Sequence, residues 1–267
     1  MDTHLSEKET ALKRILEGYA TVAVAFSGGV DSSLLLDVAH EVLGSRALAL
    51  TACHVCLPNR ERVAARTFCE ERSIRHLEVP FDEFAVPGFS ENPTNRCYLC
   101  KRELLAALLS TAKAQGIAVL AEGSNLDDLR EYRPGRQAVE ELGVVSPLML
   151  AGFSKEDIRL LSKSRGLPTW NKPACACLAT RLPYGTSLTP ELITRIDQAE
   201  QYLLDRGAKQ VRVRVHDTMA RLELDSESIP LFLEEELRLQ LNALLRALGF
   251  EFVTVDLQGY RTGSFDH

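Results

Sequence analysis

The sequence lacks any run of about 18 apolar residues, the length at which a helix crosses a membrane. It also lacks an excess of positive charge: 31 lysines and arginines stand against 37 acidic residues, for a formal net charge of −6. A broad nucleic-acid-binding surface needs a basic excess, so that class of protein is disfavoured. These absences predict a protein with neither a membrane nor a nucleic acid as its partner.

The first residues lack the apolar segment of a signal peptide, because residues 1–9 are polar and acidic. Without an export signal, the seven cysteines are expected to stay reduced in a cytoplasm and to serve metal binding or catalysis. The 267 residues, 45% hydrophobic and 25% charged, suit one large globular domain or two smaller ones.

Residues 21–36 carry the strongest signal of what the protein does. Residues 21–26 predict a buried strand, two glycines follow, and a helix begins at Val30. Glycines let the backbone approach a ligand, and the N-terminus of a helix attracts anions. The pattern differs from the Walker loop, because the lysine is missing. It predicts a nucleotide-binding loop made of Ser27, Gly28, Gly29, Asp31, Ser32 and Ser33.

Strands and helices alternate along the first part of the chain. Strands are predicted at 21–26, 47–51, 74–79, 117–121 and 144–148, and helices at 5–17, from 30, and at 60–72, 103–114, 136–142 and 154–164. This order predicts an α/β fold with a mostly parallel, doubly wound sheet and helices on both faces. Ligands bind such sheets at the carboxyl ends of the strands, where the nucleotide-binding loop is expected.

The pattern changes after residue 168. We interpret 1–168 as the nucleotide-binding domain and the proline-containing stretch 169–190 as a functional loop and linker. Residues 191–267 predict a small α+β domain. Its expected elements are a helix at 191–205, strands at 211–215 and 220–224 joined by a hairpin turn, a helix at 231–247 and a strand at 252–257.

Six of the seven cysteines form close pairs: Cys97 with Cys100, Cys175 with Cys177, and Cys53 with Cys56. Two thiolates at the C-x-x-C spacing can share one metal or cluster, and a distant third cysteine strengthens the signal. Cys97 and Cys100, together with Cys177 and with or without Cys175 as a fourth ligand, predict a zinc or iron–sulfur centre. Cys53 and Cys56 remain a rival ligand pair, whereas Cys69 is interpreted as a buried apolar residue.

Several motifs together resemble the LarE family of PP-loop ATP pyrophosphatases over nearly the whole chain. They are the strings at 27–33, 95–101, 122–128, 132–135, 177–181 and 256–264. The motif at 27–33 is typical of the whole PP-loop superfamily. The cysteine-containing motifs at 95–101 and 177–181 and the motif at 256–264 indicate the LarE family within it. The resemblance implies a homo-oligomer, a hexamer in the family.

The resemblance also implies a reaction. ATP and Mg²⁺ adenylylate a carboxylate of pyridinium-3,5-biscarboxylic acid mononucleotide, and sulfur then displaces AMP to give a thiocarboxylate for the nickel-pincer cofactor of lactate racemase. In one version of the family, a cysteine at the position of Cys177 gives up its own sulfur. In the other, three cysteines hold a [4Fe-4S] cluster whose open iron carries sulfide from a sulfur donor. Cys97 and Cys100 beside Cys177 favour the cluster version, and Cys175 is interpreted as a spare thiol.

The remaining candidates bind metal or substrate. Asp31, Asp127 and Asp128 offer oxygen ligands for Mg²⁺. Arg212 and Arg214 lie on one face of a predicted strand and can clamp a phosphate. The resemblance assigns them to the substrate phosphate, with Arg181 and Glu223 beside them.

Three other functions remain open at this point. A PP-loop tRNA thiolase also combines this loop with a cluster, although the acidic chain speaks against it. A nucleotide-binding module with structural zinc and an amidating PP-loop ligase are the other two alternatives.

Overall fold

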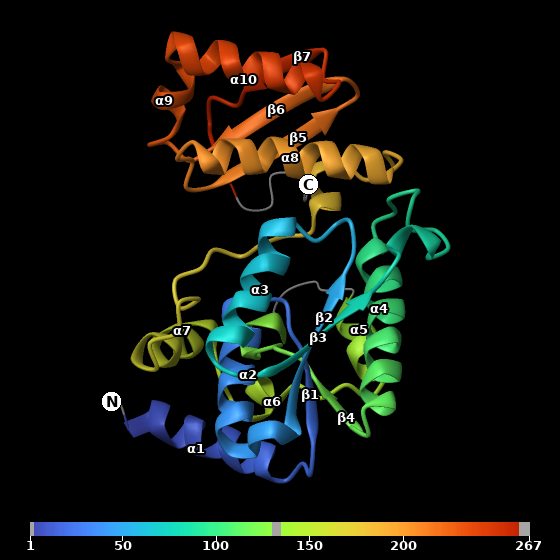
Figure 1. The fold of residues 1–267 in the computed structure, drawn as a ribbon, viewed down its shortest axis with the longest axis vertical. Coiled ribbons are helices and arrows are strands. Elements are labelled where there is room, and N and C mark those ends of the chain that lie inside the picture. The colour runs from blue at the N-terminus through green and yellow to red at the C-terminus, as the bar shows by residue number, and fades with distance from the viewer. Residues whose placement is uncertain (1–2, 130–134, 262–267) are drawn as a thin grey trace. The chain divides into compact units, whose positions relative to one another are not determined.

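The structure is a computed structural model that describes residues 3–129 and 135–261 (Figure 1). It divides into two compact units, residues 1–86 with 95–175 and residues 87–94 with 176–267. In the described ranges, no helix is both long and apolar enough to span a membrane.

The first unit is built on a four-stranded parallel sheet in the order β3-β2-β1-β4. The strands are β1 (Val22–Ala25), β2 (Ala47–Cys53), β3 (Arg75–Pro80) and β4 (Val119–Ala121). Ala23 of the central strand pairs with Leu48 on one side and Leu120 on the other. The predicted parallel α/β fold is confirmed for this unit.

Helices cover both faces of this sheet (Figure 1). The side chains of Val22 and Val24 pack with α1 (Thr3–Glu17), α2 (Val30–Leu43), α3 (Asn59–Glu71) and α7 (Lys155–Ser164). Ala23 points to the opposite face and packs with α4 (Arg96–Ala114) and α5 (Gly135–Glu141). Alternate residues of β1 therefore pack into two separate hydrophobic cores, because successive side chains of a strand point to opposite faces of the sheet.

Two of the elements predicted for the first unit differ from the structure. The predicted strand at 144–148 is wrong: Val145 makes one bridge to Ala121, and α6 (Pro147–Leu150) starts two residues later. Pro147 has no N–H for a ladder, and its fixed φ suits the first turn of a helix. The helix predicted from residue 103 begins at Arg96 instead, so it includes Cys97 and Cys100.

Among residues 3–129 and 135–261, the loops contain four short 3-10 turns: η1 (Gly44–Arg46), η2 (Glu83–Ala85), η3 (Leu126–Leu129) and η4 (Leu178–Arg181). The predicted start of α7 at Ser154 is confirmed, since its hydroxyl and the Asp157 carboxylate form a reciprocal capping box.

The second unit combines helices with a three-stranded sheet in the order β5-β6-β7. Its elements are α8 (Pro190–Asp205), β5 (Val211–His216), β6 (Met219–Leu224), α9 (Ile229–Leu233), α10 (Glu235–Ala247) and β7 (Phe252–Val255). The first two strands form the predicted antiparallel hairpin, which turns at Asp217 with φ of 52°. The helix predicted over 231–247 is broken at Glu234, whose ψ of 137° is extended. Acidic residues at the break favour a new helix start there.

Residues 87–94 belong to the second unit, although they precede the C-x-x-C motif. The Asn92 amide donates to the carbonyl of Pro183 at 2.7 Å, and the Gly185 N–H donates to the carbonyl of Asn92 at 2.9 Å. The Leu188 N–H donates to the carbonyl of Ser90 at 2.8 Å. This segment is thus fixed by hydrogen bonds, one from the Asn92 side chain and two between backbone groups, to residues nearly a hundred positions later.

Glu78 fastens α3 to β3 through two arginines. Arg62 and Arg66 each place a guanidinium nitrogen 2.6 Å from one of its carboxylate oxygens. The hydrogen bond from Arg62, reinforced by Arg66, lowers the pKa of Glu78 from 4.5 to about 2. Because the folded pKa lies below the unfolded value, this carboxylate stabilises the protein above pH 4.5, and that stabilisation is lost as the pH falls towards 2.

We expect Glu78→Gln to lower the free energy of unfolding by about 1 kcal/mol at neutral pH, the upper range for a partly exposed ion pair. The difference from the unmodified protein should shrink below pH 4.5 and vanish near pH 2. Denaturant unfolding at a series of pH values measures it. A difference that stays constant from pH 7 to pH 2 would contradict the assignment.

Candidate functional site

The glycine turn after β1 exposes the first N–H groups of α2. Gly28 has a φ of 69°, which side chains other than glycine rarely adopt. Gly29 is the N-cap of α2 and supplies no side-chain cap. Nearby hydroxyls face one another, with Ser27 Oγ and Ser32 Oγ 3.2 Å apart. Uncapped N–H groups, hydroxyls and the helix dipole together make an anion site.

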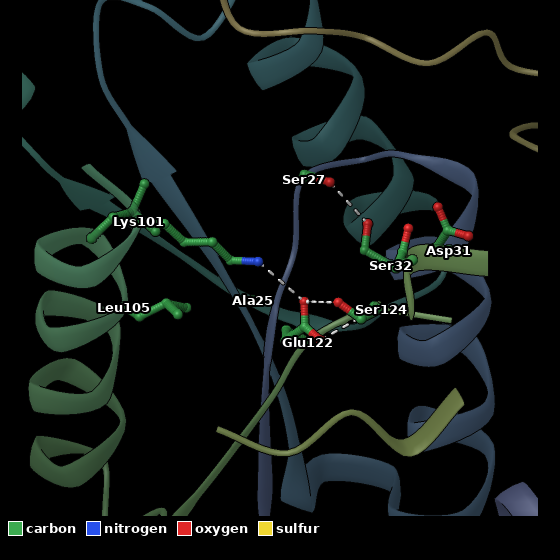
Figure 2. Close-up of a pocket in the computed structure, with 11 residues that line it drawn as sticks. Ala25, Ser27, Asp31, Ser32, Lys101, Leu105, Glu122 and Ser124 are labelled. Carbon is green, nitrogen blue, oxygen red and sulfur yellow. Dashed lines mark hydrogen bonds and ion pairs between the residues drawn. The ribbon is translucent and has the colours of Figure 1, made fainter. Parts of the chain in front are cut away.

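A pocket of about 240 Å³ opens beside this turn (Figure 2). It is lined by Ala25, Ser27, Asp31, Ser32, Lys101, Leu104, Leu105, Glu122, Gly123, Ser124 and Asp128. The lining combines the loop hydroxyls with the aliphatic side chains of Leu104 and Leu105, which suit a nucleotide with an anionic and an apolar part. It lies past the carboxyl ends of β1 and β4, where ligands of parallel sheets bind.

Gly123 lets the end of β4 approach the start of α2. A Cβ placed on it would lie 3.0 Å from the Ser32 nitrogen and 3.2 Å from the Asp31 Cβ. A larger residue would have to push the first turn of α2 away from the pocket. The glycine in the string that follows β4 therefore has a steric reason.

Asp31 lies in the pocket between two partners from other elements. Its carboxylate accepts a hydrogen bond from the Asn125 amide at 3.2 Å and is paired with the Lys155 ammonium. Asp128 is buried, also lines the pocket, and accepts from the Asn125 N–H. Asp127 does not line the pocket, and its Oδ2 accepts from the Lys155 N–H at 2.7 Å. Two of the three predicted Mg²⁺ ligands are thus brought together.

Lys101 and Glu122 face each other across the pocket, as Figure 2 shows. Lys101 Nζ lies 3.5 Å from Glu122 Oε2, and the Glu122 carboxylate also accepts from the hydroxyls of Ser124 and Ser146. Neither Lys101 nor Glu122 was predicted from the sequence to have a role of its own. Both could have been proposed from their positions, because Lys101 follows Cys100 directly and Glu122 follows the last residue of β4.

Cys97 and Cys100 lie near the N-terminus of α4, three residues apart and therefore on neighbouring positions of one helix face. Cys97 is exposed and Cys100 is half-buried. Lys101 follows Cys97 by four residues, about 6 Å along the helix. The helix that carries the cysteine pair therefore also lines the pocket.

The other cysteines of the first unit have different environments. Burial raises the pKa of the Cys69 thiol to about 12 and also raises the pKa of Cys53. Cys56 is buried, and Cys175 is exposed near the end of the unit. A high thiol pKa disfavours the thiolate that a metal needs. Across residues 3–129 and 135–261, no group of three or more histidine, cysteine or acidic side chains is placed to hold a metal ion.

The second unit contains a buried ion pair next to Cys177. Arg181 and Glu200 are both fully buried, with 2.7 Å between Nε and Oε1. Arg181 also donates to the carbonyls of Ala176 and Cys177 at 3.0 and 3.2 Å. Glu200 accepts from the Val213 N–H at 3.1 Å. This pair fixes the backbone of the half-buried Cys177 against β5.

Two more arginines, Arg212 and Arg214, lie on β5. Arg214 donates to Glu223 at 3.0 Å and to the carbonyl of Thr180 at 2.6 Å. Arg212, also buried, lies over the ring of Tyr260. The structure thus brings Arg214 and Glu223 into direct contact and places Thr180, the neighbour of Arg181, beside Arg214.

Glu200 was missed by the sequence analysis. It lies on the apolar face of α8 that also carries Ile193, Ile196 and Leu203. The sequence does contain an indication of this role: Glu200 occupies a position in the helical spacing that is otherwise filled by aliphatic residues. Such a carboxylate needs a buried partner, and a nearby arginine is the usual one.

The predicted motif at 132–135 falls largely outside the described residues, and so does the end of the string at 256–264. No role for these parts of the chain is tested by the geometry.

The chain is similar to known proteins over nearly its whole length. It is 41% identical over 262 residues to an uncharacterized protein of Synechocystis, covering 98% of each. It is 36% identical over 260 residues to the pyridinium-3,5-bisthiocarboxylic acid mononucleotide synthase of Lactiplantibacillus plantarum, covering 97% of this chain and 94% of that protein.

A more distant similarity covers a part of the chain. The chain is 27% identical over 164 residues to the argininosuccinate synthase of Haloarcula marismortui, which covers 57% of this chain and 39% of that protein. No protein-family model matches. The phosphate-binding turn, the pocket beside it and the full-length similarity agree: the chain belongs to the LarE family of PP-loop enzymes and is an ATP-dependent sulfurtransferase.

Proposed function

We propose that this protein uses ATP to convert the carboxylates of pyridinium-3,5-biscarboxylic acid mononucleotide to thiocarboxylates, as a step towards the nickel-pincer cofactor of lactate racemase. The carboxylate oxygen attacks the α-phosphorus of ATP and pyrophosphate leaves. A sulfur nucleophile then attacks the acyl carbon and AMP leaves. The L. plantarum relative is named for the corresponding bisthiocarboxylic product, which supports this substrate.

The observation that carries the proposal is the position of the cysteine pair on α4. Lys101 lies in the nucleotide pocket, and Cys97 precedes it by one helical turn. A sulfur source held at Cys97 and Cys100 would therefore be near the activated carboxylate. Proximity of this kind is the main way in which an enzyme speeds transfer to a bound, activated group.

The loop residues divide the work of the first step. The N–H groups of the α2 N-terminus and the hydroxyls of Ser27, Ser32 and Ser33 would bind the phosphates of ATP. Asp31 and Asp128 would hold Mg²⁺, whose charge offsets the negative charge that develops as pyrophosphate leaves. Lys155, paired with Asp31, would release that carboxylate when the cation arrives.

The spacing of the cysteines in the sequence supports a [4Fe-4S] cluster as the sulfur source in this proposal. Cys97, an exposed thiol, and Cys100, a half-buried one, lie at the i, i+3 spacing of one helix turn. Cys177, which belongs to the second unit, would supply the third ligand. Cys175 lies two residues before Cys177 in sequence and is interpreted as a spare thiol. Bound there, a [4Fe-4S] cluster would supply the sulfur that displaces AMP, with free sulfide as the donor that renews it.

The arginines of β5 would hold the phosphate of the mononucleotide. Arg212 and Arg214 are two residues apart and so lie on the same face of the strand. Glu223 fixes Arg214 from the neighbouring strand. Arg181 directs its donors to Glu200 and to the Cys177 segment, so we assign it to positioning that segment beside the substrate.

The proposal is tested by anaerobic reconstitution with iron and sulfide. Cys97→Ala, Cys100→Ala and Cys177→Ala should each reduce the bound iron to background, because a cluster bound by three thiolates loses a third of its ligands with each. Cys175→Ala is the matched control and should keep the full iron content. Retention of a complete cluster in any of the first three variants would contradict that cysteine's role.

The sacrificial alternative is separated by mass spectrometry of the protein after turnover. If Cys177 gave up its own sulfur, one turnover would convert it to dehydroalanine and lower the protein mass by one H₂S. An unchanged mass after several turnovers supports the cluster. Bound zinc without iron would support a structural metal instead.

A further inference from the structure

Two lysines from later in the chain reach the phosphate-binding turn at residues 27–33, which has none of its own. Lys172 Nζ donates to the carbonyl of Gly28 at 3.0 Å and lies 2.6 Å from the Glu61 carboxylate. Lys155 Nζ instead contacts Oδ2 of Asp31, the carboxylate that the proposed function assigns to Mg²⁺. The partner of Lys155 must therefore change when a metal ion binds at Asp31.

Both oxygens of the Asp31 carboxylate have a donor from the protein. The Asn125 amide donates to Oδ1 at 3.2 Å, and the Lys155 ammonium pairs with Oδ2. Asn125 is 2% exposed, and its own Oδ1 accepts from the Asp127 N–H at 3.0 Å, so this amide is held on both sides. The Lys155 side chain is 39% exposed. Water can replace a contact of the exposed ammonium but not one of the buried amide, so the ammonium leaves at the smaller cost.

The backbone of Lys155 is fixed even though its side chain is exposed. Lys155 is the first residue of α7, whose N-cap Ser154 forms the capping box with Asp157. Its N–H donates to Oδ2 of Asp127 at 2.7 Å. The ammonium therefore moves by rotation of its side chain alone, which is fast for an exposed residue. Because it now ends on the first turn of α2, it can turn to an anion bound at that helix N-terminus.

The ammonium and a divalent cation compete for the same carboxylate. Asp31 offers the oxygen ligands that Mg²⁺ prefers, but a unit positive charge already lies against one of them. Repulsion between the two cations lowers the affinity for the metal at least about 10-fold at such a partly exposed site. A bound polyphosphate removes this conflict, because it gives the ammonium another anion to pair with.

We propose that Lys155 holds the Asp31 carboxylate before a nucleotide binds, and that it turns to the pyrophosphate portion of ATP when the magnesium complex enters. Lys155 then offsets charge on the leaving pyrophosphate, while Asp31 is available to the metal. The site consequently binds a divalent cation weakly on its own and tightly together with a polyphosphate. This inference rests on the proposed binding of ATP at the turn and is independent of the sulfur source.

Titration with Mn²⁺ in the absence of nucleotide, followed by electron paramagnetic resonance of the free ion, measures the first half. Mn²⁺ takes the same oxygen ligands as Mg²⁺. Lys155→Gln should bind it about 10-fold more tightly than the unmodified protein, because the competing charge is gone. Lys155→Arg keeps the charge and should bind it weakly. In an Asp31→Ala background, Lys155→Gln should have no such effect, because the shared carboxylate is absent.

Calorimetric titration with magnesium pyrophosphate measures the second half, and the expected change has the opposite sign. Lys155→Gln should weaken binding about 10- to 100-fold, the value of one hydrogen bond to a charged group. Its affinity for AMP should be unchanged, since AMP lacks the pyrophosphate portion. Lys8→Gln is the matched control, because Lys8 makes a 2.6 Å ion pair with Asp157 on the same first turn of α7. It should leave all three titrations unchanged.

Unchanged Mn²⁺ affinity in Lys155→Gln would overturn the proposal, and so would unchanged pyrophosphate affinity. An equal loss of AMP affinity would overturn the assignment to the pyrophosphate portion. Circular dichroism would verify that each variant is folded. These titrations use neither a sulfur source nor the pyridinium substrate, so a failure of the sulfur-transfer proposal would leave them unaffected. Their own failure would likewise leave sulfur transfer untouched.

Discussion

Glu200→Ala is expected to destabilise the second unit by about 3–5 kcal/mol, which is the cost of leaving one partner of a buried ion pair with its charge uncompensated. Arg181 and Glu200 are both fully buried, so no water replaces the missing carboxylate. The Val213 N–H would lose its acceptor as well. Denaturant unfolding followed by circular dichroism should show an early transition for the variant.

Two additions make this experiment more specific: a double variant that removes both charges, and the fluorescence of the single tryptophan. Arg181→Met with Glu200→Leu removes both charges and keeps the volume, so it should recover most of the lost stability. Trp170 is the only tryptophan and belongs to the first unit. Its fluorescence should therefore report an unchanged transition in Glu200→Ala. An equally early fluorescence transition would mean that the damage is not confined to the second unit.

Asp31→Ala is expected to reduce ATP–pyrophosphate exchange at least about 100-fold, as for loss of one group that stabilises transition-state charge. Asp31 lies in the pocket on the first turn of α2, where Mg²⁺ on the phosphates would be bound. The exchange assay needs ATP, Mg²⁺, labelled pyrophosphate and the carboxylate substrate, but no sulfur source, so it measures activation without sulfur transfer.

Asp127→Ala is the control for this variant. Its carboxylate accepts from the Lys155 N–H at the start of α7 and lies outside the pocket lining. It should lose about 1 kcal/mol of stability, the usual value of a helix-terminal hydrogen bond, and keep its exchange rate. Loss of exchange in Asp127→Ala, or unchanged exchange in Asp31→Ala, would contradict the assignment of the metal site.

The parallel sheet and the phosphate-binding turn could be predicted because their signals are local. The apolar run before Ser27, the two glycines and the helix from Val30 are contiguous in sequence, and the structure has them as β1, the turn and α2. The capping box at Ser154 is local in the same sense. Where several local preferences agree, the sequence determines the element.

Features that depend on distant partners were not predictable in this way. The interaction of Lys172 with Gly28 joins residues 144 positions apart, and nothing in either neighbourhood indicates the other. Residues 144–148 carry a strand-like run, but Pro147 prevents it from continuing a hydrogen-bonded ladder. The start of α4 was placed seven residues late, because residues 80–96 have the composition of a loop up to the helix itself.

The excursion of residues 87–94 determines how this protein can be divided for laboratory work. A gene truncated after Cys175 would still encode Asn92, which is fully buried in the intact chain, while deleting its hydrogen-bond partners Pro183 and Gly185. A fragment beginning at Ala176 would lack the same eight residues from its own core. To express the two units separately, residues 87–94 must therefore be removed from the gene for the first unit and added to the gene for the second. A circular permutation could join them to the second unit.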